Sequence, residues 1–166
     1  MLIYHPGFDA YHCVFRMLAI CEKLGDLEIE KARLLDFYLL YPALVAKMKL
    51  PRLLRPIARD AAAVANVYHD PGSPATMFRD MRHIQEAALR CIAAAGLIDV
   101  KRYENGFVTR TDVVVPDAIK GKITLFLASR QPISEFVLKE LAAIPLGGSE
   151  GLKHRSQLMD HKYDFV

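Results

Sequence analysis

The most informative segment of this 166-residue chain is residues 76–115, TMFRDMRHIQEAALRCIAAAGLIDVKRYENGFVTRTDVVV. Up to Gly96, its apolar side chains recur every three to four residues, which is the period of one helix face. After Gly96 the pattern becomes that of strands, over 97–103 and 107–115, with Asn105-Gly106 between them. An Asn-Gly pair suits the positive φ angles of a tight hairpin turn. The segment therefore predicts a long amphipathic helix, with Thr76 as its cap, followed by a β-hairpin.

Helices are also predicted on both sides of this segment. Asp9 is a candidate N-cap for the first helix, which Gly25 ends. The second is expected from about Asp26 to Tyr41, and because its later half is apolar nearly all round, it should be the central helix. A third is expected over 52–66, with Pro56 fitting only near its start. Two more should follow Pro116 and Gln131-Pro132, and a polar tail begins at Ser149.

This order of elements predicts an α+β fold that is mostly helical. Residues 26–115 are expected to form a winged-helix-like core, with three helices and a β-hairpin wing. Residues 1–25 would add an N-terminal helix, and residues 116–166 would add C-terminal helices and a tail. Since there is no internal repeat and no linker of biased composition, residues 1–166 are taken as a single domain.

The composition argues against a disordered chain and against a membrane-spanning protein. The chain is 52% hydrophobic with a net charge of +3, which is the opposite of the signature of disorder. No apolar run approaches the roughly 20 residues that a membrane span needs. The start of the chain has no basic region leading into an apolar stretch, so a cytoplasmic protein is expected. Cys13, Cys21 and Cys91 are odd in number and lie in apolar helical patterns, which predicts buried, reduced thiols at all three positions.

The positive charge is concentrated in the middle of the chain. Residues 51–111 hold nine Lys or Arg against six Asp or Glu, whereas residues 1–50 and 112–166 are each balanced. In a DNA-binding winged helix, basic residues line the third helix and the wing. The candidates for contact with DNA or with a partner are Arg52, Arg55, Arg59, Arg79, Arg82, Lys101, Arg102 and Arg110. Interleaved acids weaken the field, so sequence-specific DNA binding, non-specific contact and a protein-facing surface all stay open.

Candidate catalytic and metal-binding residues are few. Asp36 lies in an apolar helix, where a carboxylate is either a perturbed acid or, more often, a hydrogen-bonded structural group. Two His/Asp groups were weighed as metal sites, namely His5, Asp9 and His12, and His154, Asp160 and His161. Neither group has the spacing of a helical ligand pair, and the chain has no nucleophile elbow and no phosphate-binding loop. No catalytic residue, cofactor or metal ligand is therefore assigned.

Three stretches of sequence resemble one family of bacterial proteins. They are YHPGFDAYHCVFR at residues 4–16, LLDFYLLYP at residues 34–42 and IQEAAL at residues 84–89. Together they resemble the small middle component of three-component ABC-ATPase conflict systems, of which the Lamassu-type anti-phage and anti-plasmid systems are examples. The resemblance implies a non-enzymatic subunit without a cofactor. It would bridge an SMC- or Rad-like ABC ATPase and a nuclease-type effector, and restrain the effector until foreign DNA is sensed.

Two rival functions remain at this point. The first is a free-standing winged-helix DNA-binding transcriptional regulator. The second is a metal-dependent hydrolase centred on His5, Asp9 and His12. Aromatic residues near the chain ends, including Phe8 and Tyr11, are candidate anchors for a partner, since aromatic side chains dominate interface energetics.

Overall fold

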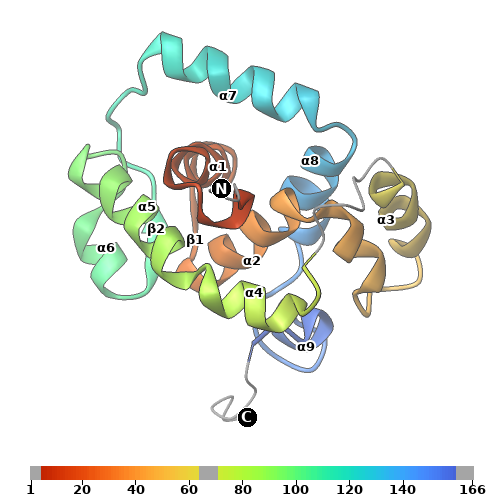
Figure 1. Cartoon of the computed structure of the whole chain (residues 1–166). Coiled ribbons are helices and arrows are strands. Elements are labelled where there is room, and N and C mark those ends of the chain that lie inside the picture. Colours follow the sequence, from red (N-terminus) through yellow and green to blue (C-terminus); the bar gives the residue numbers. More distant parts are fainter. Residues whose placement is uncertain (1–4, 64–70, 160–166) are drawn as a thin grey trace.

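The structure is a computed structural model that describes residues 5–63 and 71–159. In these residues the fold is mostly helical, with a two-stranded antiparallel sheet (Figure 1). The α-helices are α1 (Ala10–Leu24), α2 (Ile29–Leu40), α3 (Arg55–Ala62), α4 (Pro74–Asp80), α5 (Arg82–Ala94), α6 (Val100–Glu104), α7 (Asp117–Ser129), α8 (Ile133–Glu135) and α9 (Leu152–Ser156). The strands are β1 (Asp26–Glu28) and β2 (Phe107–Thr109); η1 (Pro6–Phe8) and η2 (Pro42–Lys47) are 3₁₀-helices, and η4 (Phe136–Leu141) is a π-helix.

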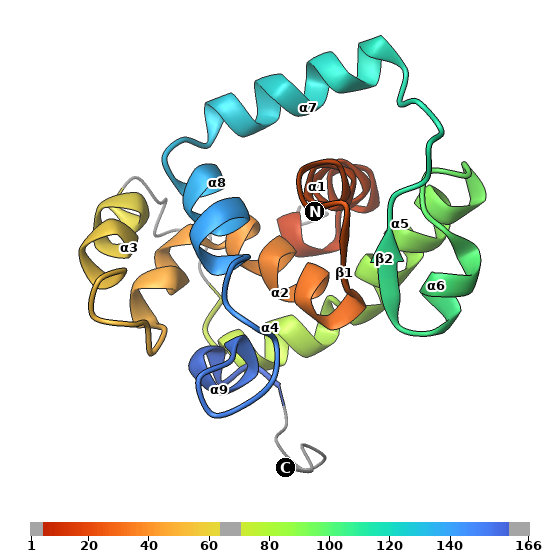
Figure 2. The ribbon, with the colours of Figure 1, turned by 180° about the vertical axis from the view of Figure 1, so that it is seen from behind.

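Helix α2 is the central element of the core, as the sequence predicts. Every side chain from Ala32 to Leu39 is buried. Helix α1 packs most extensively on α5 and then on α2, while η4 packs on α2 from another direction. Figures 1 and 2 show α7 crossing above α1 at one end of the molecule, with α3 on one flank and α6 with β2 on the other. An apolar surface on all sides of a helix requires neighbours on all sides, and the fold supplies them.

The segment between α1 and α2 corrects one prediction. Asp9 caps α1 as expected, accepting a hydrogen bond from the His12 amide at 3.0 Å. Gly25 then ends α1 at a positive φ of 74°. The next three residues, predicted as the start of a helix, form β1 instead, and α2 begins only at Ile29. The physical reason is pairing: Leu27 lies opposite Val108 in the sheet, and both side chains are buried.

The predicted hairpin over 97–103 and 107–115 forms only at its base, where the Asp99 amide donates to the Thr109 main-chain oxygen at 2.8 Å and the Thr111 amide donates to that of Leu97 at 3.1 Å. Val100–Glu104 is helix α6, and Asp99 caps it by accepting a hydrogen bond from the Arg102 amide at 2.8 Å. Only Ile98 of the first predicted strand forms a β-bridge, with Arg110. The second predicted strand is confirmed over the short β2, but its partner in the sheet is β1. A strand pattern of alternating side chains did not reveal the local cap that starts the helix.

The long predicted helix over 76–95 is divided into two. Helix α4 ends at Asp80 and α5 begins at Arg82. Ser73, not Thr76, caps α4, because the Ser73 hydroxyl accepts a hydrogen bond from the Thr76 amide at 3.4 Å. The third predicted helix is confirmed from Arg55 to Ala62, and Pro56 lies in its first turn, where no amide donor is needed. Its predicted end at 64–66 is outside the described residues.

Candidate functional site

A buried ion pair lies in the core between α1 and α2. Arg16 donates from Nε to Oδ1 of Asp36 at 2.6 Å and from Nη2 to Oδ2 at 3.4 Å. From α5, Gln85 donates its Nε2 hydrogen to the same Oδ2 at 2.8 Å. All three side chains are buried. A buried carboxylate is tolerated only where donors satisfy it, so each of these helices depends on the other two at this point.

The three sequence stretches that carry the resemblance meet at this ion pair. Arg16 ends the first stretch, Asp36 lies in the second and Gln85 lies in the third. Stretches separated by tens of residues in the sequence are therefore joined through one buried network. This explains why polar side chains occur within such apolar helices: each one satisfies another across a helix–helix contact.

The network continues from Gln85 to the surface. Arg33 donates from Nε to Oε1 of Gln85 at 2.9 Å and from Nη1 to Oε2 of Glu30 at 2.6 Å. Its guanidinium also lies over the ring of Phe78 in α4, 4.6 Å from the centroid. Burial lowers the pKa of the Arg33 guanidinium, with Glu30 acting in the opposite direction. Two arginines and two carboxylates balance in charge, which is the arrangement expected of a structural network.

Arg16 is held in its charged form. Burial opposes the charge on its guanidinium, but the adjacent Asp36 carboxylate outweighs that effect and raises the Arg16 pKa above its ordinary value. The hydrogen-bonded role predicted for Asp36 is confirmed, whereas its partner Arg16 was not anticipated. A signal was present in the sequence, because a single Arg in one apolar helix face and a single Asp in another are expected to pair.

The candidate group of His5, Asp9 and His12 has local contacts instead of a shared centre. Both carboxylate oxygens of Asp9 face His12: Oδ1 accepts from its amide, and Oδ2 lies 2.9 Å from its Nδ1. His5 Nδ1 accepts from the Gly7 amide at 3.3 Å. Across residues 5–63 and 71–159, no group of three or more His, Cys, Asp or Glu side chains could hold a metal ion. Asp160 and His161 of the second candidate group lie outside the described residues.

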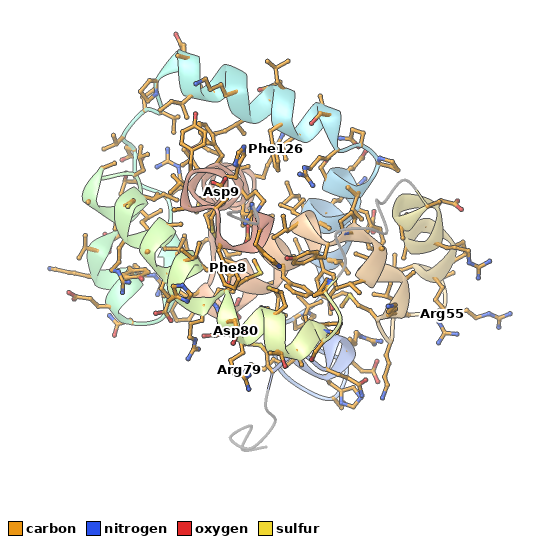
Figure 3. The ribbon with its side chains drawn as sticks, in the orientation of Figure 1. Phe8, Asp9, Arg55, Arg79, Asp80 and Phe126 are labelled. Atoms are coloured by element: carbon orange, nitrogen blue, oxygen red, sulfur yellow. The ribbon has the colours of Figure 1, made fainter. Side chains whose placement is uncertain are left out.

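The predicted basic residues of α4 and α5 are engaged with neighbouring acids. Arg82 lies 2.8 Å from Glu30 and 3.4 Å from Glu86. Arg79 lies 3.5 Å from Asp80, and Figure 3 shows this pair on α4, away from Arg55. Surface ion pairs are weak, but they reduce the positive field that a nucleic acid would meet here.

The basic residues predicted for the wing are also used within the chain. Arg102 lies 3.2 Å from Asp26 and stacks on the Phe107 ring, 4.3 Å from its centroid. Arg110 pairs with Glu22 of α1 and donates to the main-chain oxygen of Leu97. These two arginines therefore attach β2 and α6 to the rest of the fold. Lys101 is exposed on α6 and forms no ion pair within the described part of the chain.

The remaining predicted cations gather beside α3. Arg55 and Arg59 line a cavity of about 500 Å³ together with Lys49 and Arg155, which the sequence analysis did not single out. Arg155 comes from α9, more than 100 positions away, and donates from Nη1 to the Lys49 main-chain oxygen at 2.6 Å. The sequence signal for Lys49 was available, since residues 47–59 contain five Lys or Arg and no acid. No local pattern points to Arg155.

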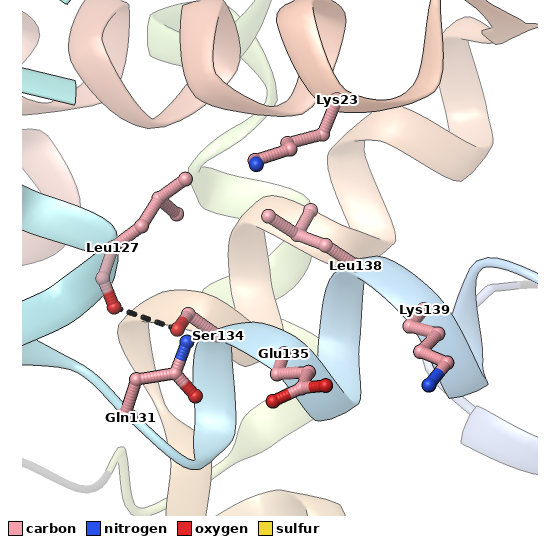
Figure 4. Close-up of a pocket in the computed structure, with 7 residues that line it drawn as sticks. All are labelled: Lys23, Leu127, Gln131, Ser134, Glu135, Leu138 and Lys139. Atoms are coloured by element: carbon pink, nitrogen blue, oxygen red, sulfur yellow. Dashed lines mark hydrogen bonds between the residues drawn. The ribbon is translucent and has the colours of Figure 1, made fainter. Parts of the chain in front are cut away.

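A smaller polar pocket of about 320 Å³ lies between α1, α7 and the α8–η4 segment (Figure 4). Lys23 enters it from α1, and Glu135 and Lys139 enter it from the opposite side. The Ser134 hydroxyl beside it donates to the Leu127 main-chain oxygen at 2.7 Å. That hydroxyl is therefore committed to a structural hydrogen bond, which is not the arrangement of an activated nucleophile.

The cysteines fall into two classes. Cys13 and Cys21 are buried in the core, and Cys91 is exposed. Burial raises the pKa of the Cys13 and Cys21 thiols to about 12, so both remain protonated near neutral pH. The predicted burial is confirmed for Cys13 and Cys21 and is wrong for Cys91, which is exposed on α5.

None of the helices in the described residues is both long enough and apolar enough to cross a membrane.

The comparisons with known proteins give one match. A family model described as ABC-three component (ABC-3C) system Middle Component 5 matches residues 2–164. The match includes all three stretches on which the resemblance rests, together with the C-terminal third of the chain. No curated protein and no solved structure matches the chain significantly.

Proposed function

The chain belongs to the ABC-3C system Middle Component 5 family, and from this membership we propose that it is a non-enzymatic accessory subunit of an ABC ATPase defence complex. In this proposal, the subunit links an SMC- or Rad-like ABC ATPase to a nuclease-type effector, as in Lamassu-type systems. It restrains the effector until foreign DNA is sensed. The observation that carries the proposal is the family match over nearly the whole chain.

The described structure supports an accessory role through its use of charged groups. The buried ionisable side chains of Arg16, Arg33 and Asp36 hold helices together. Two aromatic side chains near the start of the chain are exposed, Phe8 by 41% and Tyr11 by 60%. Exposed aromatic rings are suitable anchors for a protein partner.

A winged-helix-like arrangement forms part of the same proposal. Strand β1 lies between α1 and α2, β2 follows α5 and pairs with β1, and Ile98 bridges Arg110 beside it. This order supports a small sheet against α1, α2 and α5. The proposed arrangement differs from the predicted core of residues 26–115, because α1 lies outside that range and packs most extensively on α5. The short helix α6 stands where a wing would connect its two strands.

The alternative is a free-standing winged-helix DNA-binding regulator, which the same arrangement of elements favours. A regulator of this kind would form a symmetric dimer and bind a palindromic duplex with a steep dependence on salt. The intramolecular ion pairs of Arg82, Arg102 and Arg110 weigh against it, because these are the cations that would face DNA. In the accessory-subunit proposal, DNA contact is non-specific and secondary.

Co-expression tests the proposal. The full chain carries an affinity tag and is produced together with the proteins encoded by the neighbouring genes, and the mass and composition of the purified material are measured. We expect a stable complex that contains an ABC ATPase and an effector. A lone dimer that retains one specific DNA sequence would overturn the proposal in favour of the regulator, and a lone chain without DNA would overturn both.

A further inference from the structure

A cluster of cations surrounds α3, and we name it the basic α3 face. It consists of Lys47, Lys49, Arg52, Arg55 and Arg59, which follow one another along the chain, and of Arg155 of α9; Lys49, Arg55, Arg59 and Arg155 line one cavity. Among the described residues, none of the first five forms an ion pair with a carboxylate; only Arg155 is paired, with Glu150. This differs from Arg82, Arg102 and Arg110, whose charges are balanced by neighbouring acids. Asp60 is the one acid within α3, so the basic α3 face keeps a net positive charge.

Large apolar side chains lie among these cations. Leu53 is 86% exposed, and Ile57, four residues later, is 47% exposed. Of the described side chains of α3, only Ala58 is buried. Helix α3 packs mainly on η2 and also contacts α8 and η4, and most of its described side chains are exposed. Leu53 and Ile57 are four residues apart, and so are Arg55 and Arg59, but the two pairs are offset by two positions and lie on different sides of α3 and the turn before it. A segment that contacts both pairs would therefore lie across the exposed outer surface of α3.

The cavity beside α3 is lined by both cationic and apolar side chains. Its walls include Met48, Leu50 and Ala58, and its polar lining is Lys49, Arg55, Arg59 and Arg155. Arg55 donates from Nε to the Leu50 main-chain oxygen at 3.0 Å, which holds its guanidinium at this position. Figure 3 shows Arg55 at the outer edge of the molecule. A carboxylate entering the cavity would find a preoriented guanidinium and an apolar wall.

We propose that the basic α3 face is the docking surface for an acidic segment of a protein partner that also carries apolar side chains. The acidic groups pair with Arg55, Arg59 and Lys49, and the apolar groups cover Leu53 and Ile57. The inference rests on the proposed function, because it takes the ABC ATPase or the effector as the protein that supplies the segment. The charge complementarity and the exposed Leu–Ile pair together select this occupant.

The apolar pair favours a protein over a nucleic acid. A phosphate backbone would satisfy the cations, but it would leave Leu53 and Ile57 in contact with water, with no gain from their burial. An acidic segment that also carries apolar side chains would pair with the cations and bury the two apolar side chains. Interfaces gain most of their affinity from buried apolar anchors surrounded by polar contacts.

The test measures the affinity of the full-length purified chain for the purified ATPase and the purified effector encoded beside it. Two double variants separate the contribution of charge from that of apolar contact. Arg55→Glu/Arg59→Glu reverses the charge, and Leu53→Ser/Ile57→Ser removes the apolar pair. We expect each to raise the Kd for the same partner by about tenfold or more. Charge reversal on the acidic segment of that partner should restore binding to Arg55→Glu/Arg59→Glu.

The matched control is Lys120→Glu/Lys139→Glu, which makes the same change in net charge on exposed positions of α7 and η4. We expect it to bind both partners like the wild type. Because all six substituted side chains are exposed, each variant should keep the thermal unfolding midpoint of the wild type, and far-UV circular dichroism checks this. A 30-base-pair DNA duplex is the second probe, and its binding is measured at low and high salt.

The outcomes separate the two proposals. If the wild type binds its partners and both α3 variants bind equally well, the docking surface is wrong and the proposed function stands. If only Arg55→Glu/Arg59→Glu has an effect, and it also removes binding of the duplex, the basic α3 face is a nucleic-acid surface and the docking proposal is overturned. If the wild type binds neither partner, both proposals fail.

Discussion

At the scale of single residues, the protein places a few polar side chains where the sequence is otherwise apolar. Arg16, Asp36 and Gln85 are each isolated within a hydrophobic helix face, yet together they satisfy one another. A buried charge pair adds little net stability compared with apolar residues of the same volume, but the loss of one member leaves the other uncompensated. We therefore expect the network to act mainly by fixing how α1, α2 and α5 pack on one another.

Substitution of Asp36 tests this view. We expect Asp36→Ala to lower the free energy of unfolding by about 3–5 kcal/mol, because the Arg16 guanidinium would remain buried without its carboxylate. The double variant Arg16→Met/Asp36→Leu should lose less than the single one, since no charge remains to be satisfied. Urea unfolding followed by circular dichroism measures both values. Equal losses in the two variants would contradict the role of the ion pair.

The thiols give a second prediction at this scale. With the native protein at pH 8, we expect a thiol reagent such as DTNB to modify one cysteine rapidly, and all three only after unfolding in urea. Cys91→Ser should leave no rapidly reacting thiol in the native state, because Cys13 and Cys21 are buried. Rapid modification of that variant would show that the core opens around Cys13 or Cys21 far more often than expected.

The same two buried thiols predict a dependence of stability on pH. Burial raises their pKa to about 12 in the folded state from an ordinary value of 9.0, so the unfolded chain releases these protons first as the pH rises. The stabilising contribution is therefore complete below pH 9 and is lost between about pH 9 and pH 12. Between pH 8 and pH 10, ionisation of each thiol in the unfolded chain should lower the free energy of unfolding by about 1 kcal/mol. Cys13→Ala/Cys21→Ala should show a correspondingly smaller loss over this interval.

At the scale of elements, residues 100–109 show that a turn signal in the sequence does not determine whether a strand or a helix comes before it. Asn105-Gly106 predicts the turn of a hairpin, and Gly106 does take a positive φ of 88°. That conformation instead ends α6 and directs the chain into β2, and the Gly106 main-chain oxygen accepts a hydrogen bond from the Ile29 amide at 2.9 Å. The prediction of a positive φ at Gly106 is thus confirmed, whereas the element before it is a helix and not the predicted strand.

Two glycine substitutions should have opposite effects. At Gly106 an added Cβ would meet nothing within 4 Å, so Gly106→Ala should be unfavourable by about 1 kcal/mol from its positive φ alone. Gly121, within α7, is equally open and has no positive φ. Gly121→Ala should therefore stabilise the protein by about 0.5–1 kcal/mol through helix propensity. Urea unfolding compares the two, and a loss of stability in Gly121→Ala would show that α7 needs the flexibility of glycine.

At the scale of the whole molecule, one hydrophobic cluster joins the described parts of the chain. It includes Cys13 of α1, Leu89 of α5, Phe136 of η4 and Leu152 of α9. An early helix and the last described helix thus share one core. Such a core is expected to unfold as one cooperative unit, as a single domain would.

Leu152→Ala tests this cooperativity. The side chain is 1% exposed, so its truncation should lower the free energy of unfolding by about 2–5 kcal/mol. Because α9 shares the core, circular dichroism and tyrosine fluorescence should give coincident unfolding curves in the wild type and in the variant. A separate early transition in the variant would show that the C-terminal segment folds independently of the rest.

The candidate contact residues fall into two groups, according to whether the fold gives them an acidic neighbour. Sequence charge alone pointed to Arg55 and Arg59, and the structure brings them together with Lys49 at one cavity. The same reasoning also chose Arg102 and Arg110, which the fold uses to attach its small sheet. Composition reveals where charge is concentrated along the chain, but whether an arginine has an acidic neighbour depends on elements that are distant in sequence.

Features that depend on neighbouring residues were accessible from the sequence. The cap at Asp9, the stop at Gly25 and the central position of α2 follow from side chains within a few positions of one another. The pairing of β1 with β2, the Arg16–Asp36 contact and the approach of Arg155 to Lys49 depended on the tertiary structure. Each joins segments at least 20 residues apart, and no local propensity specifies which of many distant segments will satisfy a given strand edge, buried charge or exposed carbonyl.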